Sequence, residues 1–166
     1  NVCFNKDFKE TPSELKMRVP AGCKLHTIGT LGERQAQAER AAEAEKQAQA
    51  ESVFYKSVDG WAEFFPQKIK AAEAIKRCWT DKSETLKLNG DPLRNGGLQD
   101  LPSVISQMTF LKRLDFSYNM FSSLPGSIGS LHNLINVNLT GNRVTEIGNA
   151  LRGLVHGCQV HVSDNV

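Results

Sequence analysis

The stretch Leu111-Lys112-Arg113-Leu114-Asp115-Phe116-Ser117-Tyr118-Asn119-Met120-Phe121-Ser122-Ser123-Leu124-Pro125 decides the fold, because its pattern returns at a fixed spacing of 23 residues. Positions related by this spacing are Leu114, Val137 and Val160; Phe116, Leu139 and Val162; and Asn119, Asn142 and Asn165. A fixed period of this length indicates stacked structural repeats, each of which needs its neighbours to bury its apolar face.

Each repeat is expected to contain one short strand, at Arg113–Ser117 and at Asn136–Thr140. Apolar and polar side chains alternate in both, so the apolar ones can stack between repeats while the polar ones face solvent. The repeated Asn can hydrogen-bond backbone groups where the chain turns away. An earlier unit at Leu86–Leu88 precedes Leu114 at a longer spacing, and we expect the extra residues to form a loop within Pro92–Gly97.

Two helical regions precede the repeats. Glu33–Glu51 contains Ala, Glu, Gln, Lys and Arg without Gly, Pro or β-branched residues, so its helix propensity is high, but its only apolar side chain is Ala. A solvated spacer helix is favoured over a partner-binding or self-associating one, because a wide apolar stripe is missing. Trp61–Trp79 is expected to form a helical cap over the first repeat strand, with a new helix beginning at Pro66.

From Trp61 to Val166 the sequence resembles the leucine-rich repeats of effectors that bacteria inject through type III secretion, some of which carry a novel E3 ubiquitin ligase domain. The resemblance is carried by Trp61, an Ala-rich helix, Arg77-Cys78, Leu86-x-Leu88 and the terminal Gly157-Cys158-Gln159-Val160-His161-Val162. It departs from the family where Asn165 is followed by Val166 instead of Pro.

The resemblance implies an α/β fold: a leucine-rich-repeat solenoid with an N-terminal helical cap, preceded by a long helix and a partial repeat end. The repeated Asn would be the asparagine ladder of this family. The expected segments are 1–31, a partial repeat end of a preceding array; 32–52, an Ala/Glu/Gln-rich linker helix; 53–84, the helical cap; and 85–166, the leucine-rich repeats.

The assignment of 1–31 depends on an internal duplication. Gly22-Cys23-Lys24-Leu25-His26 matches Gly157-Cys158-Gln159-Val160-His161, and Val2 and Leu25 again stand 23 apart. Isolated repeat strands cannot bury their apolar faces alone. We therefore expect residues 1–31 to self-associate by adding strands to the open edge of another copy.

Charge and cysteine usage exclude several classes. The formal charge of +2 comes from interspersed signs, and apolar runs are short, so neither nucleic acid nor membrane is an expected partner. Cys78 is expected to be a buried structural thiol. Two sulfurs and two imidazoles in Cys23-x-x-His26 and Cys158-x-x-His161 could form a zinc site, but distant repeat ends are the favoured interpretation. We expect no cofactor, no metal and no catalytic residue.

The outward face of the strands is the expected partner-binding surface, because stacked repeats usually bind there. Its predicted residues are Lys87, Arg113, Asp115, Tyr118, Asn136, Asn138, Thr140 and His161.

The leading hypothesis is a protein-interaction module: the host-target-recognition repeats of an effector secreted by bacteria into the host cell cytoplasm. The alternatives are the substrate-recognition arm of an E3 ubiquitin ligase whose catalytic domain is not in this chain, and a structural spacer in a large repeat protein.

Overall fold

The computed structural model describes residues 31–91, 97–145, 154 and 157–165. The chain divides into two compact units, residues 1–48 and 49–166. The expected repeat end at 1–31, with its self-association, lies outside the described residues except for Leu31, as does most of the loop expected at Pro92–Gly97.

Helix α2 (Leu31–Ala62) changes character along its length. Side chains 32–50 are exposed, in keeping with a solvated spacer. Further on, Phe54, Val58 and Ala62 stand four residues apart and are buried on one face. Rather than ending at residue 52, α2 therefore continues into the expected cap region. No helix in the described part of the chain is long and apolar enough to cross a membrane.

Helix α3 (Pro66–Asp81) begins at Pro66 as predicted, after an extended Phe65. It ends where Lys82 adopts the left-handed conformation (φ 49°) and its N–H reaches the carbonyls of Cys78 and Trp79. One stripe of α3 is buried and packs against the first strand, as a cap requires. The buried residues are Lys68, Ala71, Ala72, Ile75 and Cys78.

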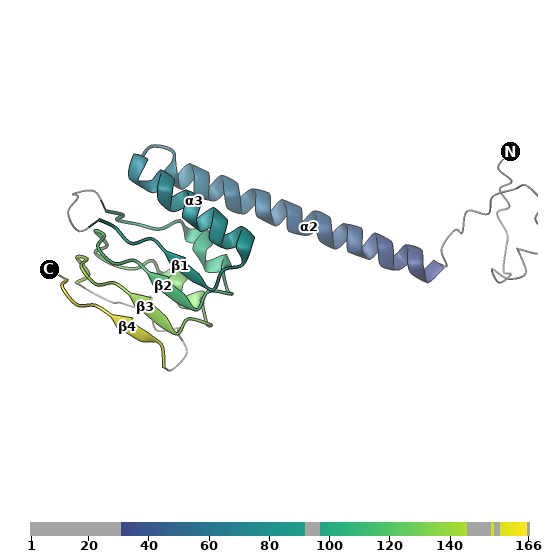
Figure 1. The fold of residues 1–166 in the computed structure, drawn as a ribbon. Helices are drawn as coiled ribbons and strands as arrows, with labels where there is room; N and C mark the ends of the chain where they lie inside the picture. The colour runs from purple at the N-terminus through teal and green to yellow at the C-terminus, as the bar shows by residue number, and fades with distance from the viewer. Residues whose placement is uncertain (1–30, 92–96, 146–153, 155–156, 166) are drawn as a thin grey trace, which may run out of the picture. The chain divides into compact units, whose positions relative to one another are not determined.

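Four short strands form one parallel sheet in the order β1-β2-β3-β4 (Figure 1). They are β1 (Thr85–Lys87), β2 (Arg113–Asp115), β3 (Asn136–Asn138) and β4 (Gln159–His161). Their register aligns the inward residues Leu86, Leu114, Val137 and Val160. The 23-residue spacing therefore predicted the pairing correctly, and the longer first spacing is absorbed between β1 and β2.

The strands end earlier than predicted, and local side-chain bonds accompany their ends. The Ser117 N–H donates to Asp115 Oδ1 at 3.1 Å, and the Thr140 N–H donates to Asn138 Oδ1 at 3.1 Å. Each side chain thus bonds the backbone two residues ahead. Backbone bonds between repeats continue past the strand ends, since the Gly90 N–H donates to Ser117 O and the Tyr118 N–H donates to Thr140 O, both at 2.8 Å. Ser117 and Thr140 lie just beyond strands β2 and β3.

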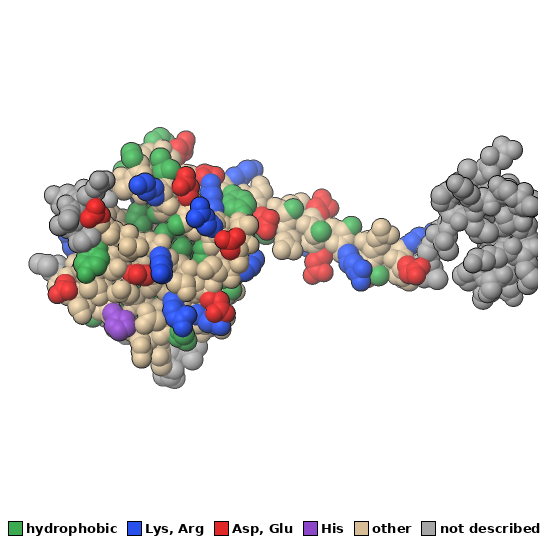
Figure 2. All heavy atoms as spheres, in the orientation of Figure 1, with side chains coloured by type: hydrophobic (Ala, Val, Ile, Leu, Met, Phe, Trp, Pro, Cys, Tyr) green, Lys and Arg blue, Asp and Glu red, His purple; other side chains and the backbone are tan. Residues whose placement is uncertain are grey.

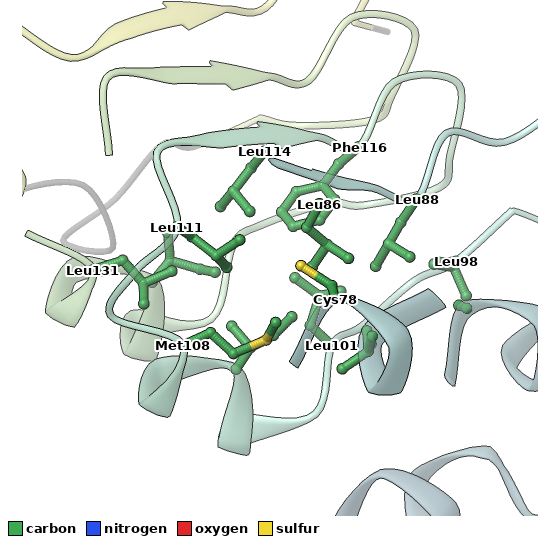
Figure 3. Close-up of a cluster of buried hydrophobic side chains, with 14 of the residues drawn as sticks. Cys78, Leu86, Leu88, Leu98, Leu101, Met108, Leu111, Leu114, Phe116 and Leu131 are labelled. Carbon is green, nitrogen blue, oxygen red and sulfur yellow. The ribbon is translucent and has the colours of Figure 1, made fainter. Parts of the chain in front are cut away.

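Between the strands the chain returns through 3₁₀ turns on the other side of the core. These turns, η1 (Ser103–Gln107) and η2 (Gly126–Ser130), follow Pro102 and Pro125 and contact each other. Figure 3 shows the apolar side chains that fill the space between sheet and turns, including Leu86, Leu114, Phe116 and Met108. The cap and the repeats share one continuous core.

A row of asparagines links successive repeats. Asn119 Nδ2 donates to Leu88 O at 2.7 Å, and Asn142 Nδ2 donates to Phe116 O at 2.9 Å. Asn165 Nδ2 repeats this with Leu139 O at 3.0 Å. The predicted role of the repeated Asn is confirmed. The mixed α/β class is likewise confirmed, although four three-residue strands do not by themselves establish a longer solenoid.

Candidate binding surface on the strand face

The strand face, defined by the outward residues of β1–β4, consists of two parallel rows. One row is Thr85, Arg113, Asn136 and Gln159, and the other is Lys87, Asp115, Asn138 and His161. Backbone register alone brings these side chains together from positions far apart in sequence. Gln159 was not among the predicted residues, although it stands 23 residues after Asn136 and the same periodicity could have found it.

Tyr118 and Thr140 do not lie on strands, contrary to expectation. Tyr118 follows the bond between Ser117 and Asp115 at the end of β2, and it has a left-handed φ of 57°. Thr140 itself closes the equivalent bond to Asn138 at the end of β3. The Tyr118 ring lies over Gly141, where an added Cβ would be 2.6 Å from Tyr118 Cδ1. Tyr118 as a residue is 43% exposed. It therefore borders the strand face instead of projecting from its centre.

Hydrogen bonds tie several face residues to one another. Asp115 Oδ1 accepts from the Ser117 hydroxyl at 2.7 Å and from Asn138 Nδ2 at 3.2 Å. Asn136 Nδ2 lies 3.1 Å from His161 Nε2. These bonds hold the side chains in one arrangement before any partner arrives, which lowers the entropy cost of binding.

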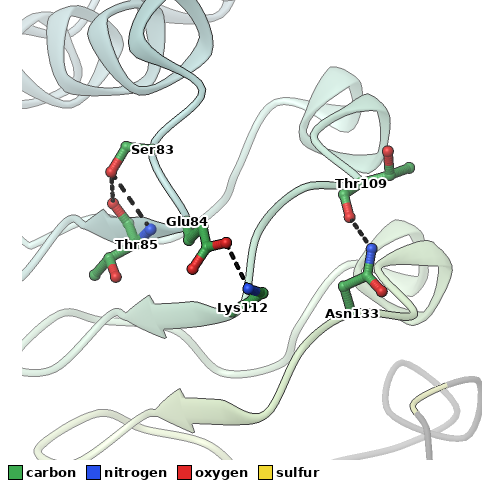
Figure 4. Close-up of polar contacts among 6 residues, drawn as sticks. All are labelled: Ser83, Glu84, Thr85, Thr109, Lys112 and Asn133. Atoms are coloured by element: carbon green, nitrogen blue, oxygen red, sulfur yellow. Dashed lines mark hydrogen bonds and ion pairs between the residues drawn. The ribbon is translucent and has the colours of Figure 1, made fainter.

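Two cations on the face are unpaired. Lys87 and Arg113 are exposed, and the structure gives neither side chain a partner among the described residues. By contrast, Lys112 pairs with Glu84 beside the start of β2 (Figure 4). The free hydrogen-bonding groups of the face therefore include two cationic donors, Lys87 and Arg113.

Further polar contacts lie at the starts of the repeats, one of them between two repeats and one within the segment that leads into β1. Asn133 Nδ2 donates to Thr109 O at 2.7 Å, and the Ser83 hydroxyl donates to Thr85 O at 3.1 Å (Figure 4). On the side of the molecule seen in Figure 2, cationic and anionic side chains are interspersed and do not gather into one basic area.

Cys78 lies in the core beside Leu86 and Leu101 (Figure 3). Its Sγ donates to Ser83 O at 3.3 Å. Burial raises the pKa of the Cys78 thiol to about 11; the Ser83 side chain opposes this shift, and the charge of Asp81 adds to it. The thiol is therefore neutral near pH 7 and a poor nucleophile or metal ligand.

Cys158 is half-buried, and burial raises the pKa of its thiol as well. The described residues contain no cluster of His, Cys, Asp and Glu that could hold a metal ion. Cys23 and His26, the other half of the zinc alternative, lie outside the described residues.

Comparisons with known proteins place the chain only loosely. No protein-family model matches it, and no curated protein does. A solved structure described as the leucine-rich-repeat domain of a Shigella effector is similar, with 18% identity and a TM-score of 0.37. The match covers 62% of this chain and 62% of that chain. A likeness of that extent does not assign a function.

Proposed function

We propose that this chain is a protein-interaction module of stacked leucine-rich repeats, which holds another protein on its strand face and performs no catalysis itself. The observation that carries the proposal is the pair of aligned rows on β1–β4, in which exposed cations stand beside a fixed polar network. Tyr118 adds a partly exposed aromatic anchor at the border.

The rigidity of the scaffold supports this role. Leu114 and Val137 are buried beneath the face, and the asparagine row bonds one repeat to the next. Side chains on such a support lose little further freedom on binding, so their contacts contribute more of their free energy to affinity.

The narrower proposal is that the partner is a host protein and that the chain belongs to an effector secreted by bacteria into the host cell cytoplasm. This proposal depends on the resemblance of residues 61–166 to the repeats of such effectors. One alternative is that the repeats are the substrate-recognition arm of an E3 ubiquitin ligase whose catalytic domain is not in this chain. A spacer in a large repeat protein is the remaining alternative, and it predicts no captured partner.

The experiment is affinity capture from a eukaryotic lysate, followed by a direct measurement of Kd with the purified partner. The double substitution Arg113→Ala and Tyr118→Ala should weaken binding by about tenfold or more while the protein stays folded, because both side chains are exposed. The matched control, Arg77→Ala with Val53→Ala, also removes one exposed cation and one exposed apolar side chain. If the control loses binding and the test variant does not, the strand face is not the site.

Self-association through residues 1–31 is a second proposal, favoured by β4. Val162 is 39% exposed, whereas Leu139 and Phe116 at the equivalent positions are fully buried. Among the described residues, no strand pairs with the outer edge of β4. The segment containing Leu25 has the apolar spacing of a repeat strand, and another copy could supply it to this edge.

A further inference from the structure

Exposed hydrophobic side chains gather where α2 turns into α3. Phe64 is 79% exposed, Ile69 is 50% exposed and Phe65 is 47% exposed. Figure 2 shows hydrophobic side chains grouped at this end of the two helices, with acidic side chains beside them. Single exposed apolar residues are ordinary, but a group of this kind with a polar rim marks an interaction surface.

Part of this group has a structural role and part does not. The Lys68 ammonium lies 4.7 Å from the Phe65 ring centre and 4.9 Å from the Trp61 ring centre, and it pairs with Asp100 at 2.6 Å. Phe65 therefore helps to bind the cap to the first repeat. Phe64 makes no comparable ring or cation contact among the described residues.

A hollow of about 240 Å³ lies between the two helices beside this group. Its lining comes from one stripe of α2 and one stripe of α3, spaced three or four residues apart. The small side chains of Ala62 and Ala72 leave the space, and Ile69 completes an apolar floor. The remaining lining residues are Asp59, Glu63, Glu73 and Lys76.

The rim of the hollow is acidic. Lys76 bonds to Asp59, so these two charges offset each other. Glu63 and Glu73 are exposed, and the structure gives neither a partner in the described part of the chain. Two unpaired carboxylates therefore flank an apolar floor.

We propose that this hollow docks a basic amphipathic segment of a second protein. An apolar side chain of that segment would contact Ala62 and Ile69, and its Lys or Arg heads would reach Glu63 and Glu73. The aliphatic stem of a basic side chain suits this geometry, because it covers apolar surface while its charge stays at the rim. The carboxylates disfavour anionic lipid and nucleic acid by repulsion.

A short amphipathic peptide of Leu and Lys, with Leu at helical spacing, is the probe. Titrated calorimetrically into the full chain at low salt, it should bind saturably with one site. A peptide of the same pattern with Glu in place of Lys should bind about tenfold more weakly or not at all, and so should one with Ser in place of Leu. Equal binding of the Leu–Lys and Leu–Glu peptides would overturn the proposal.

Variants locate the site. Glu63→Lys with Glu73→Lys should weaken the Leu–Lys peptide by about tenfold or more. Glu43→Lys with Glu45→Lys makes the same charge change on the exposed first half of α2 and should leave binding unchanged. Phe64→Ser should also weaken binding of the Leu–Lys peptide. Because Phe64 is exposed, this variant should unfold at the normal temperature, and a normal thermal unfolding curve would exclude loss of fold as the cause.

Two outcomes separate this surface from others. The Arg113→Ala, Tyr118→Ala variant should bind the peptide normally, so failure of the strand-face function would leave this proposal standing. Binding of the chain to anionic phospholipid vesicles, with no response to the peptide, would show that the exposed group serves a membrane and would refute the proposal.

Discussion

Asn119→Ala should be the most damaging single change in the asparagine row, because it leaves two buried backbone groups without partners. Asn119 Nδ2 donates to Leu88 O at 2.7 Å, and Asn119 Oδ1 accepts from the Leu98 N–H at 2.9 Å. Among the described residues neither backbone group has a second partner. Phe116 O, another acceptor of Asn119, keeps its bond from Asn142.

The third acceptor, Ser117 O, keeps the Gly90 N–H at 2.8 Å. Each buried polar group left unsatisfied costs about 1–3 kcal/mol, so Asn119→Ala should lower the free energy of unfolding by about 2–6 kcal/mol. Asn142→Ala should cost about half as much. The three carbonyl oxygens that accept from Asn142 Nδ2 all have other donors, so this substitution leaves only the Phe121 N–H without a partner among the described residues.

Urea unfolding followed by tryptophan fluorescence measures the difference, because Trp79 stacks on Phe54 at 4.2 Å in the cap that shares the core of the repeats. The control is Asn133→Ala, whose bond to Thr109 O is exposed and should contribute about 1 kcal/mol or less. If Asn142→Ala proves as costly as Asn119→Ala, the counting of orphaned groups is wrong.

Cys78 should react with iodoacetamide far more slowly than Cys158, and its reaction rate should rise only as the pH approaches its pKa of about 11. Peptide mass spectrometry measures both rates, and equal rates at neutral pH would contradict this prediction. Gly90→Ala should destabilise the fold by about 2 kcal/mol or more, because the new Cβ would lie 1.7 Å from Tyr118 O, whereas Gly126→Ala meets open space and should leave thermal unfolding unchanged. Light scattering should show the intact chain forming assemblies that a version lacking residues 1–31 does not form, and two monomers of equal stability would end the self-association proposal.

Much of the repeat region was predictable because its signal is periodic. The spacing between Leu114, Val137 and Val160 predicted which residues pair across the sheet, and the alternation around them predicted most of the strand face. The start of α3 was equally predictable from Pro66. The strand lengths were not. Alternation of apolar and polar residues continues past Asp115 and Asn138, and the side-chain-to-backbone bonds at the strand ends leave this sequence pattern unchanged.

The continuation of α2 through residue 52 was missed for a related reason. The composition changes there from Ala-rich to aromatic, which indicated a boundary, yet Phe54 and Val58 stand four residues apart on one helical face and lie in the core. The border position of Tyr118 was missed because its left-handed φ depends on the turn and on the space over Gly141.

The amino-acid sequence by itself determined the repeat, the parallel register and the inward row, because burial of a periodic apolar set has one consistent solution. Tertiary structure alone decided which polar groups remain free. Asp115 is occupied while Lys87 and Arg113 are not, and Lys76 is paired while Glu63 and Glu73 are not. Whether a polar side chain is paired depends on distances of a few ångströms between side chains of separate elements, because the strength of hydrogen bonds and ion pairs falls off over that range.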